Sequence, residues 1–252
     1  MAASGVVLIT GAAGGIGAAT ARAFARHGWS VALGYVNSEG QARALAVECG
    51  ALGVDTLLVQ GDVGDDADCK RMVAEVLERF GRVDVLVNNA ARTIFAPQSD
   101  LDALTADDFL NLYRNNVVSV YQMSRAVAPA MRAQGEGVVI NICSRAGITG
   151  GGSSMAYAAS KAALHTLTRS LARLLAPTIR VNCIAPGWVD SSWHYRQSEE
   201  KGKQAKAGYA SKAVLKRVTE PRNVADAVYW AATGAPAMTG EVISMDAGMH
   251  LA

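Results

Sequence analysis

The sequence predicts an α/β fold: one doubly wound parallel sheet of about seven strands with helices on both faces. Three observations predict this fold. Short runs rich in Val, Ile and Leu recur along the chain, and segments with helical periodicity separate them. The apolar runs lack strict alternation with polar residues, which is typical of parallel strands covered on both faces. Alternating strands and helices imply right-handed crossovers within one sheet.

Seven apolar runs are the predicted strands. In chain order they are Val6–Ile9, Val31–Leu33, Thr56–Val59, Val83–Val87, Val138–Ile142, Ile179–Ile184 and Val242–Met245. The clearest helical segments are Ala18–Arg26, Asp65–Phe80, Asn116–Ala133 and Ala156–Leu175. No Pro- or Ser-rich linker divides the chain, so we expect one domain over residues 1–252. The only break in composition is residues 191–217, which contain the polar run Gln197–Lys206.

Composition excludes several functional classes. The formal net charge is +2 and the basic residues are scattered, so the chain has no electrostatic footprint for nucleic acid. The four cysteines form no Cys-x-x-Cys pair, and we expect no metal site. Cys143 and Cys183 fall within predicted strands, where we expect free, buried thiols rather than a disulfide. Met1–Ser4 lack a basic region and no apolar run reaches membrane-spanning length, which together predict a cytoplasmic protein.

A glycine-rich segment follows the first predicted strand. Residues 10–17 read TGAAGGIG and lead directly into the first helix. Glycine lets the backbone turn tightly and approach a pyrophosphate, and the N-terminus of a helix attracts an anion. Glycines also end strands for purely structural reasons, so the segment alone is a weak signal. Its place between a strand and a helix favours dinucleotide binding.

Three polar residues are predicted to meet at the carboxyl edge of the sheet. Tyr157 and Lys161 are four apart on a predicted helix and project from one face, although such a pair can also serve packing and solvation alone. Ser144 follows the fifth strand, thirteen residues earlier. Reduction of a ketone needs a proton donor, and tyrosine has a pKa of about 10. A neighbouring ammonium would lower the pKa of Tyr157, so we expect Lys161 to do so.

These motifs resemble those of the short-chain dehydrogenases/reductases, which have a Rossmann-type fold, and the resemblance extends over essentially the whole chain. It implies a nicotinamide-dependent enzyme that interconverts ketones and secondary alcohols. Ser144 would bind the substrate oxygen, Tyr157 would transfer the proton, and Lys161 would also bind the nicotinamide ribose. Asn116 matches the residue that supports a water near the lysine. Its neighbour Asn115 is an alternative for that role, and a helical Asn can also be merely solvated.

The resemblance also implies a set of cofactor contacts. Asp62 and Val63 match an adenine-binding pair, and Ala91 stands where relatives usually have glycine. The Pro-Gly segment after the sixth strand would pack on the nicotinamide, with Ser191 in place of the usual threonine. The predicted cofactor-binding residues are Gly11, Ala13, Gly14, Gly15, Ile16, Gly17, Tyr35, Asn37, Ser38, Asp62, Val63, Asn89, Ala90, Ala91, Tyr157, Lys161, Pro186, Gly187, Val189 and Ser191.

The end of the second strand bears on the choice of cofactor. Folds that select NAD place an acid there to bind the ribose 2′-hydroxyl, and this chain has Tyr35. The missing acid favours NADP(H), and Asn37 and Ser38 could bind its phosphate. No arginine is present to grip that phosphate, and Gly14 stands where NADP-dependent relatives often have a basic residue. NAD(H) therefore remains an alternative.

Residues 191–217 are where relatives place a mobile substrate lid. Trp193, His194 and Tyr195 would line its pocket. Basic side chains of the lid could bind a carboxylate or an acyl-carrier protein, although interspersed acids weaken this interpretation. These side chains are Lys201, Lys203, Lys206, Lys212, Lys216 and Arg217.

Three functions follow from these motifs, the first being an NADPH-dependent carbonyl reductase of the 3-oxoacyl-carrier-protein reductase type. The second is an NAD-dependent alcohol or sugar dehydrogenase. The third is a non-catalytic dinucleotide sensor, which would not need Ser144, Tyr157 and Lys161. Helices with more than one apolar face, together with the resemblance, predict a homotetramer or a homodimer.

Overall fold

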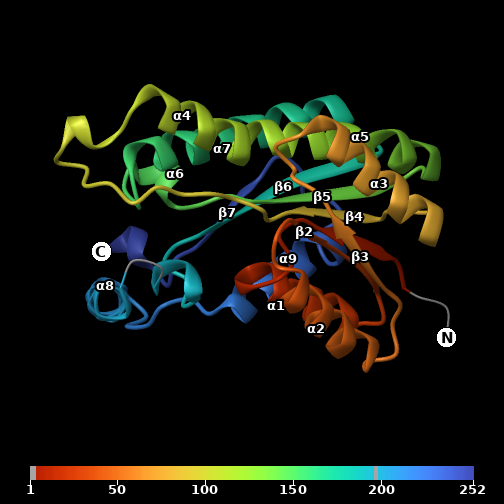
Figure 1. Cartoon of the computed structure of the whole chain (residues 1–252), viewed down its shortest axis with the longest axis horizontal. Helices are drawn as coiled ribbons and strands as arrows, with labels where there is room; N and C mark the ends of the chain where they lie inside the picture. Colours follow the sequence, from red (N-terminus) through yellow and green to blue (C-terminus); the bar gives the residue numbers. More distant parts are fainter. Residues whose placement is uncertain (1–3, 196–197) are drawn as a thin grey trace.

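A computed structural model of the chain describes residues 4–195 and 198–252. Its seven strands form one parallel sheet in the order β3-β2-β1-β4-β5-β6-β7, which confirms the predicted fold (Figure 1). The strands lie within a residue or two of the predicted runs. They are β1 Val6–Ile9, β2 Ser30–Tyr35, β3 Thr56–Gln60, β4 Val85–Asn88, β5 Gly137–Ile142, β6 Ile179–Pro186 and β7 Val242–Met245.

The strand order reverses between β1 and β4. The chain builds outward from β1 through β2 to β3, and then returns to the other side of β1 to continue with β4. In the register, Ile9 lies opposite Leu33 on one side and Val87 on the other. The connections leaving β1 and β4 therefore diverge at one point of the carboxyl edge. Open α/β sheets bind their ligands at such a point.

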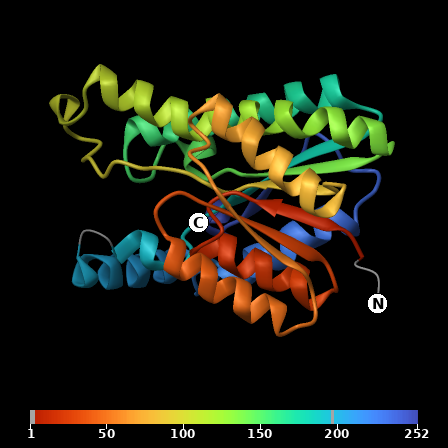
Figure 2. The ribbon, with the colours of Figure 1, turned by 45° about the vertical axis from the view of Figure 1, so that its right-hand side comes forward.

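Helices cover both faces of this sheet (Figures 1 and 2). One layer contains α1, α2 and α9, and the other contains α3, α5 and α7, with α4 and α6 packed against α7. The helix α8 lies apart at the end of the sheet, away from both layers (Figure 2). The bounds are α1 Gly15–Arg26, α2 Glu39–Gly50, α3 Asp66–Phe80, α4 Ala106–Tyr113, α5 Ser119–Gln134, α6 Ala146–Thr149, α7 Met155–Leu175, α8 Glu199–Lys212 and α9 Pro221–Thr233.

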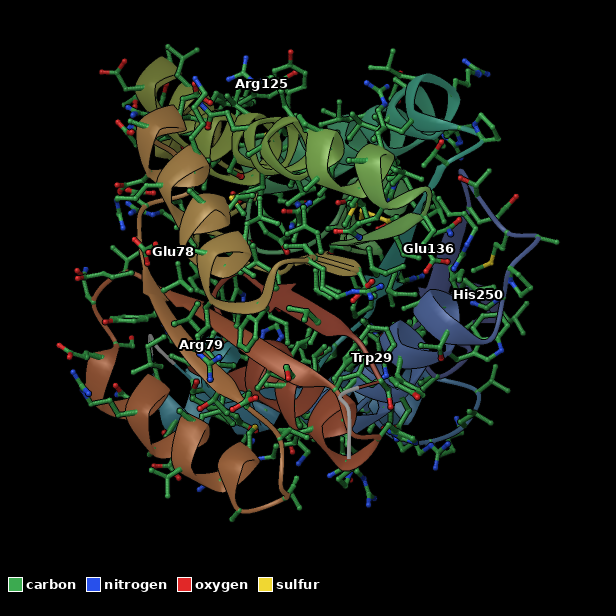
Figure 3. The ribbon with its side chains drawn as sticks, turned by 90° about the vertical axis from the view of Figure 1, so that its right-hand side faces the viewer. Trp29, Glu78, Arg79, Arg125, Glu136 and His250 are labelled. Atoms are coloured by element: carbon green, nitrogen blue, oxygen red, sulfur yellow. A yellow bond between two sulfur atoms is a disulfide. The ribbon has the colours of Figure 1, made fainter. Side chains whose placement is uncertain are left out.

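Each helical layer encloses its own apolar core. Leu8 and Met131 belong to the core under α3, α5 and α7, while Ile9 and Phe24 belong to the core under α1 and α9. Successive strand residues face opposite cores because side chains alternate along a strand. Figure 3 shows side chains filling the space between the sheet and the helices, with Arg125 on the outside. No helix among the described residues is both long and apolar enough to cross a membrane.

Local signals explain where the long helices begin and end. The side chain of Asp65 accepts hydrogen bonds from the Ala67 and Asp68 N–H groups and caps α3, while Gly81 ends that helix with φ 73°. Ser154 caps α7 by accepting a hydrogen bond from the Tyr157 N–H at 3.2 Å. This cap places Tyr157 in the first turn of α7, next to the carboxyl edge of the sheet.

The expectation of free thiols at Cys143 and Cys183 was wrong. Both residues are buried, as expected, but the structure joins their sulfur atoms in a disulfide. The backbone explains the contact, because the Cys143 N–H donates to the Ile184 carbonyl on the neighbouring strand and brings the two Cα atoms to 6.1 Å. That distance is within the range that a disulfide spans. The strands are 40 residues apart in sequence, so the sequence alone did not reveal that they are neighbours.

Candidate active site

A groove of about 1530 Å³ runs along the carboxyl edge of the sheet, from the glycine-rich loop to α8. It brings together Ser144 and all the predicted cofactor residues except Gly17, which lies behind the loop. Asn116, the fourth predicted catalytic residue, is fully buried and does not line the groove, whereas Asn115 does. Residues from distant parts of the chain thus meet in one cleft, as the sequence predicted.

Hydrogen bonds hold the glycine-rich loop to the segment that follows β4. The Thr10 hydroxyl accepts hydrogen bonds from the N–H groups of Asn89 and Ala90, both at 3.0 Å. In return, the Asn89 side-chain amide donates to the carbonyls of Thr10 at 3.0 Å and Gly11 at 2.9 Å. Gly11 has φ 62°, a conformation that favours glycine. The segment after β4 therefore fixes the shape of the loop.

The same region fits the pyrophosphate of a dinucleotide. A Cβ atom at Gly17 would come within 2.4 Å of the Gly11 carbonyl oxygen, so the first turn of α1 can pack this closely on the loop only with glycine. Gly14 has open space around its Cα, which leaves room above the loop for a ligand. The N-terminus of α1 points its unpaired N–H groups at that space. Ala91 replaces the usual glycine without strain, because its φ is not in the left-handed region.

Substitution of Gly17 by alanine is expected to damage this site. The added methyl would meet backbone atoms that cannot move cheaply, so we expect a loss of stability of about 1–3 kcal/mol and a dinucleotide Kd raised at least about tenfold. Thermal unfolding and fluorescence titration with the dinucleotide would measure both effects. Gly40→Ala is the matched control, because a Cβ there meets nothing within 4 Å. Equal stability of the two variants would contradict the packing argument.

The adenine end of the groove is formed by the ends of β2 and β3. Tyr35 is the last residue of β2, as predicted, and lines the groove with Asn37 and Ser38. Ser38 stands at the N-cap of α2 without using its side chain as a cap. Asp62 accepts a hydrogen bond from the Gly64 N–H at 2.8 Å, and the Arg92 guanidinium lies 3.7 Å from its carboxylate. The end of β2 thus offers hydroxyl and amide groups to a ribose.

Tyr157, Ser144 and Lys161 form the chemical centre of the groove. A hydrogen bond joins the side chains of Tyr157 and Ser144. The Ser144 hydroxyl also accepts a hydrogen bond from the Ala146 N–H at 3.1 Å. Lys161 donates from Nζ to the Ile142 carbonyl at 2.9 Å, and this nitrogen lies 5.8 Å from the centre of the Tyr157 ring. The predicted meeting of these three residues is therefore present.

Burial decides the protonation of this centre. It raises the pKa of Tyr157 to about 12, and the hydrogen bond with Ser144 only partly opposes this effect. Burial also lowers the pKa of Lys161 to about 8. The expectation that Lys161 lowers the pKa of Tyr157 is therefore wrong for the chain by itself, because the ammonium is held by Ile142 rather than by the phenol. At neutral pH the phenol keeps its proton and can donate it.

Asn116 connects the centre to the rest of the fold. It lies in a π-helical turn, Arg114–Val118, between α4 and α5. Its side-chain oxygen accepts a hydrogen bond from the Arg92 N–H at 2.8 Å, and its amide donates to the Ser160 hydroxyl at 3.0 Å. Ser160 immediately precedes Lys161 on α7. Such π turns often occur at functional sites, and sequence periodicity alone did not predict this one.

Aromatic residues after β6 cover the other end of the groove. The rings of Trp188 and His194 are stacked with their centres 3.7 Å apart. Trp193 lies 6.5 Å from the Tyr157 ring, measured between centres. Of the predicted lining residues, Trp193 and His194 do line the groove, whereas Tyr195 donates a hydrogen bond to the Asp190 carboxylate. Arg196 and Gln197, also in the expected lid, lie outside the described residues.

Three of the six basic residues of this segment have partners within the chain. Lys203 pairs with Glu199, Lys206 pairs with Asp190, and Lys216 donates a hydrogen bond to the Ser211 carbonyl. Lys201 is the member of the set that lines the groove, and Lys212 and Arg217 are exposed. Binding of a carboxylate or an acyl-carrier protein by these side chains stays a prediction.

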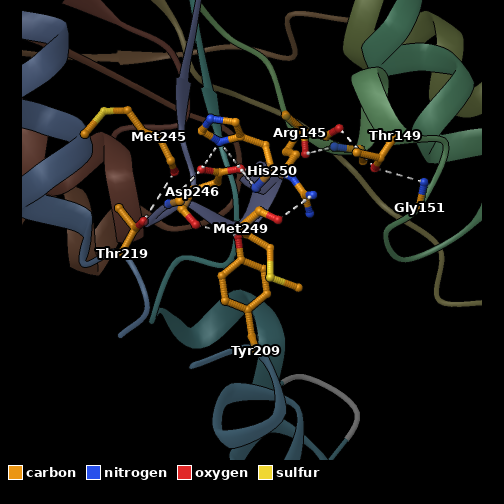
Figure 4. A network of polar contacts seen from close by, with 12 residues as sticks. Arg145, Thr149, Gly151, Tyr209, Thr219, Met245, Asp246, Met249 and His250 are labelled. Carbon is orange, nitrogen blue, oxygen red and sulfur yellow. Dashed lines mark hydrogen bonds and ion pairs between the residues drawn. The ribbon is translucent and has the colours of Figure 1, made fainter. Parts of the chain in front are cut away.

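A buried carboxylate ties the groove to the last residues of the chain (Figure 4). Asp246 pairs with Arg145, which directly follows Ser144, and accepts a hydrogen bond from the His250 N–H at 3.0 Å. The Tyr209 hydroxyl of α8 donates to the Asp246 carbonyl at 3.1 Å. Burial alone would raise the pKa of Asp246, but His250, the Gly248 N–H and Arg145 together lower it. Asp246 thus joins α8 and the last residues of the chain to the segment after β5 that contains Ser144.

Several residues of the groove were missed in the sequence. Arg145, Tyr209 and Met249 line it, although their positions in the sequence carry no motif. The loop after β4 adds Phe95. Adjacency to Ser144 was a possible signal for Arg145, whereas Met249 is brought to the site only by the tertiary fold.

One buried group of potential metal ligands lies behind the centre. Cys143, Cys183 and His165 have their donor atoms within 4.8 Å of one another. The two sulfurs are bonded to each other, so they offer no thiolate to a metal ion.

Comparison with known proteins identifies the family of this chain. The family model for short chain dehydrogenases matches residues 5–202. The chain belongs to the short-chain dehydrogenases. A 3-oxoacyl-[acyl-carrier-protein] reductase, FabG, of Staphylococcus epidermidis is 33% identical over 246 residues, which cover 97% of this chain and 98% of the relative.

Solved structures agree with this assignment to the short-chain dehydrogenases. Levodione reductase has 32% identity and a TM-score of 0.90, with 99% of both chains covered. NAD+-bound xylitol dehydrogenase has 29% identity and a TM-score of 0.89, with 98% of this chain and 99% of the other covered. The protein is therefore an oxidoreductase that uses a nicotinamide dinucleotide and interconverts carbonyl and alcohol groups.

Proposed function

We propose that this enzyme works as an NADPH-dependent reductase of ketones, with Tyr157 as the proton donor. The observation that carries the proposal is the state of Tyr157: it is bonded to Ser144 in the groove, and its pKa is raised to about 12. A protonated phenol is the form that reduction requires, whereas oxidation of an alcohol requires a phenolate. At neutral pH the centre therefore holds the proton that reduction of a ketone requires.

The proposed reaction assigns one role to each side chain. A nicotinamide dinucleotide held in the groove would supply the hydride for the carbonyl carbon. Ser144 and Tyr157 bind the carbonyl oxygen, and the Tyr157 hydroxyl gives that oxygen its proton as the C–O π electrons move onto it. With the dinucleotide bound, Lys161, protonated below a pKa of about 8, would stabilise the phenolate that remains until the phenol regains a proton from solvent, an effect that the chain by itself does not show. Asn116 acts as a positioning residue, because it holds Ser160 next to Lys161.

The residues that would hold the dinucleotide line the groove, apart from Gly17. The loop of residues 11–17 would take the pyrophosphate, and Asp62 and Val63 the adenine. Pro186, Gly187, Val189 and Ser191 would contact the nicotinamide, as the matching family positions do. The close approach of Ser191 to the loop supports this arrangement, since a Cβ on Gly15 would lie 3.8 Å from the Ser191 Cβ.

Support for NADPH comes from the end of β2. Tyr35, Asn37 and Ser38 present no carboxylate that would repel a 2′-phosphate, and the Ser38 hydroxyl is not used as a helix cap. Comparison of kcat/KM with NADPH and with NADH tests this choice. A clear preference for NADH would overturn it.

Asn37→Asp provides a sharper measurement, because it adds a charge without changing the shape. We expect the new carboxylate to raise the KM for NADPH at least about tenfold through repulsion of the 2′-phosphate, while the KM for NADH changes little. Steady-state kinetics with both nucleotides would measure the shift. Asn111→Asp, at an exposed position outside the groove, controls for the added negative charge. A parallel loss with both nucleotides would argue against phosphate binding at Asn37.

The alternative is an NAD-dependent dehydrogenase of alcohols or sugars. Its support is the lack of any arginine at the end of β2 and the NAD+ found in xylitol dehydrogenase, a structural relative. The nucleotide comparison above separates the two functions.

Three further predictions stay open to direct test. Residues 191–217 are proposed to move as a lid, an assembly of two or four copies is expected, and a cytoplasmic location is expected from the sequence. Light scattering at micromolar concentration would measure the assembly, and a monomer would contradict it.

A further inference from the structure

The substrate end of the groove is rich in aromatic side chains. The chain has only 4 Trp and 4 Phe, yet Trp188, Trp193 and Phe95 line this end together with Tyr157 and Tyr209. Aromatic residues make up 6% of the whole sequence, so the groove concentrates them strongly. Their arrangement therefore bears on which substrates fit.

Trp188, His194 and Trp193 form an aromatic wall at this end of the groove. Trp188 and His194 stack face to face, with their ring centres 3.7 Å apart and an angle of 16° between their planes. Trp193 lies next along the chain, 6.5 Å from the Tyr157 ring and tilted by 50° to it. The wall thus begins beside the proposed proton donor and continues away from it.

This wall carries no charge at neutral pH. Burial lowers the pKa of His194 to about 4, and the opposing effect of Asp190 is smaller. The Arg145 guanidinium, which lines the same end, is paired with the buried Asp246. Among the described residues that line the substrate end, none carries a carboxylate. The wall itself therefore offers no charged partner to a substrate, although Lys201 also lines the groove.

Small side chains line the groove as well. They are Ala146, Gly151, Gly152 and Ser153. A Cβ atom on Gly152 would lie 3.6 Å from the Tyr157 ring, so glycine at this position leaves more space beside the phenol for a planar group.

We propose that the enzyme prefers ketones that carry a flat, uncharged ring one or two bonds from the carbonyl group. This inference rests on the proposed function, since it requires the carbonyl oxygen to be bound by Tyr157 and Ser144. A carbonyl held there directs its substituents toward Trp193 and the Trp188–His194 pair. Aromatic rings gain from offset and edge contacts with other rings beyond the area that they bury. An aliphatic ring of equal size gains only from the buried area.

A pair of matched ketones tests the preference. 1-Phenylpropan-2-one and 1-cyclohexylpropan-2-one have the same skeleton, and neither has its carbonyl conjugated, so the two carbonyls are similar in reactivity. We expect kcat/KM for the phenyl ketone to be roughly fivefold higher with the unmodified enzyme. In Trp193→Leu the ratio should fall to within about twofold, and in Trp193→Phe it should persist. Trp230→Leu, at an exposed position of α9, is the matched control and should retain the native ratio.

The possible failures are distinguishable. Equal kcat/KM for the two ketones, or a native ratio in both Trp193→Leu and Trp188→Leu, would overturn the aromatic preference and leave the proposed reductase intact. A much better rate with a linear acetoacetyl thioester would also overturn it, and would favour an acyl substrate. Failure to reduce any of the three compounds with either nucleotide would reject the proposed function and this inference together.

Discussion

Tyr157→Phe is expected to lower kcat for ketone reduction by about 10³- to 10⁴-fold, while the dinucleotide Kd changes less than about threefold. The substitution removes one oxygen atom and keeps the ring that lies beside Trp193. General acid catalysis by a positioned side chain contributes up to about 10⁴-fold, so loss of the only proposed donor should remove most of the rate. Stopped-flow measurement of NADPH oxidation, together with nucleotide titration, would separate the two parameters.

A second tyrosine supplies the control for this substitution. Tyr113→Phe also removes one phenol oxygen, but on the exposed side of α4, and should leave kcat unchanged. Full activity in Tyr157→Phe would show that another group donates the proton. Loss of nucleotide binding in that variant would show that the Tyr157 hydroxyl is needed to bind the cofactor.

Lys161→Met is expected to abolish measurable activity and yet to stabilise the fold at pH 7. Lys161 is 2% exposed and its pKa is lowered to about 8 by burial. Below pH 8 both the folded and the unfolded protein carry the proton, so the folded state bears the whole cost of the buried charge. That cost is on the order of 3 kcal/mol, less the hydrogen bond to Ile142. Methionine has a similar length and removes the charge.

The sign of the pH dependence tests the same argument. Above pH 8 the folded protein loses this proton while the unfolded chain keeps it up to about pH 10.5, so the cost is relieved as the pH rises. The stability gained by Lys161→Met should therefore shrink between pH 7 and pH 10. Denaturant unfolding at the two pH values would measure it, and an equal gain at both would contradict a buried ammonium. In the unmodified enzyme, kcat/KM should decrease above about pH 8.

Much of the fold could be predicted because the apolar runs correspond to real strands. The predicted strand boundaries are wrong where pairing with a neighbouring strand overrides the local sequence pattern. In β2 the run ends at Leu33, yet Gly34 and Tyr35 continue the strand because they pair with Val59 and Gln60 of β3. The π-helical turn at Arg114–Val118 likewise has no signal in sequence periodicity, although it contains Asn116.

The candidate site likewise has features that the sequence predicts and features that it does not. Ser144, Tyr157 and Lys161 could be found because their spacing is fixed by one strand and one helix. The disulfide between Cys143 and Cys183 and the contact of Arg145 with Met249 could not, because these pairs are 40 and 104 residues apart. Protonation was also missed, since the pKa of Tyr157 depends on burial that only the folded chain produces.

The attachment of Thr10 to Asn89 and Ala90 has a consequence for how this enzyme can change. These hydrogen bonds hold the glycine-rich loop to the centre of the sheet before any nucleotide binds. The entropy cost of ordering the loop therefore falls on folding and not on binding. Trp193, His194 and Tyr209, at the substrate end of the groove, stand outside those bonds. Mutations at these three positions can therefore exchange one substrate for another without disturbing the loop that holds the nucleotide.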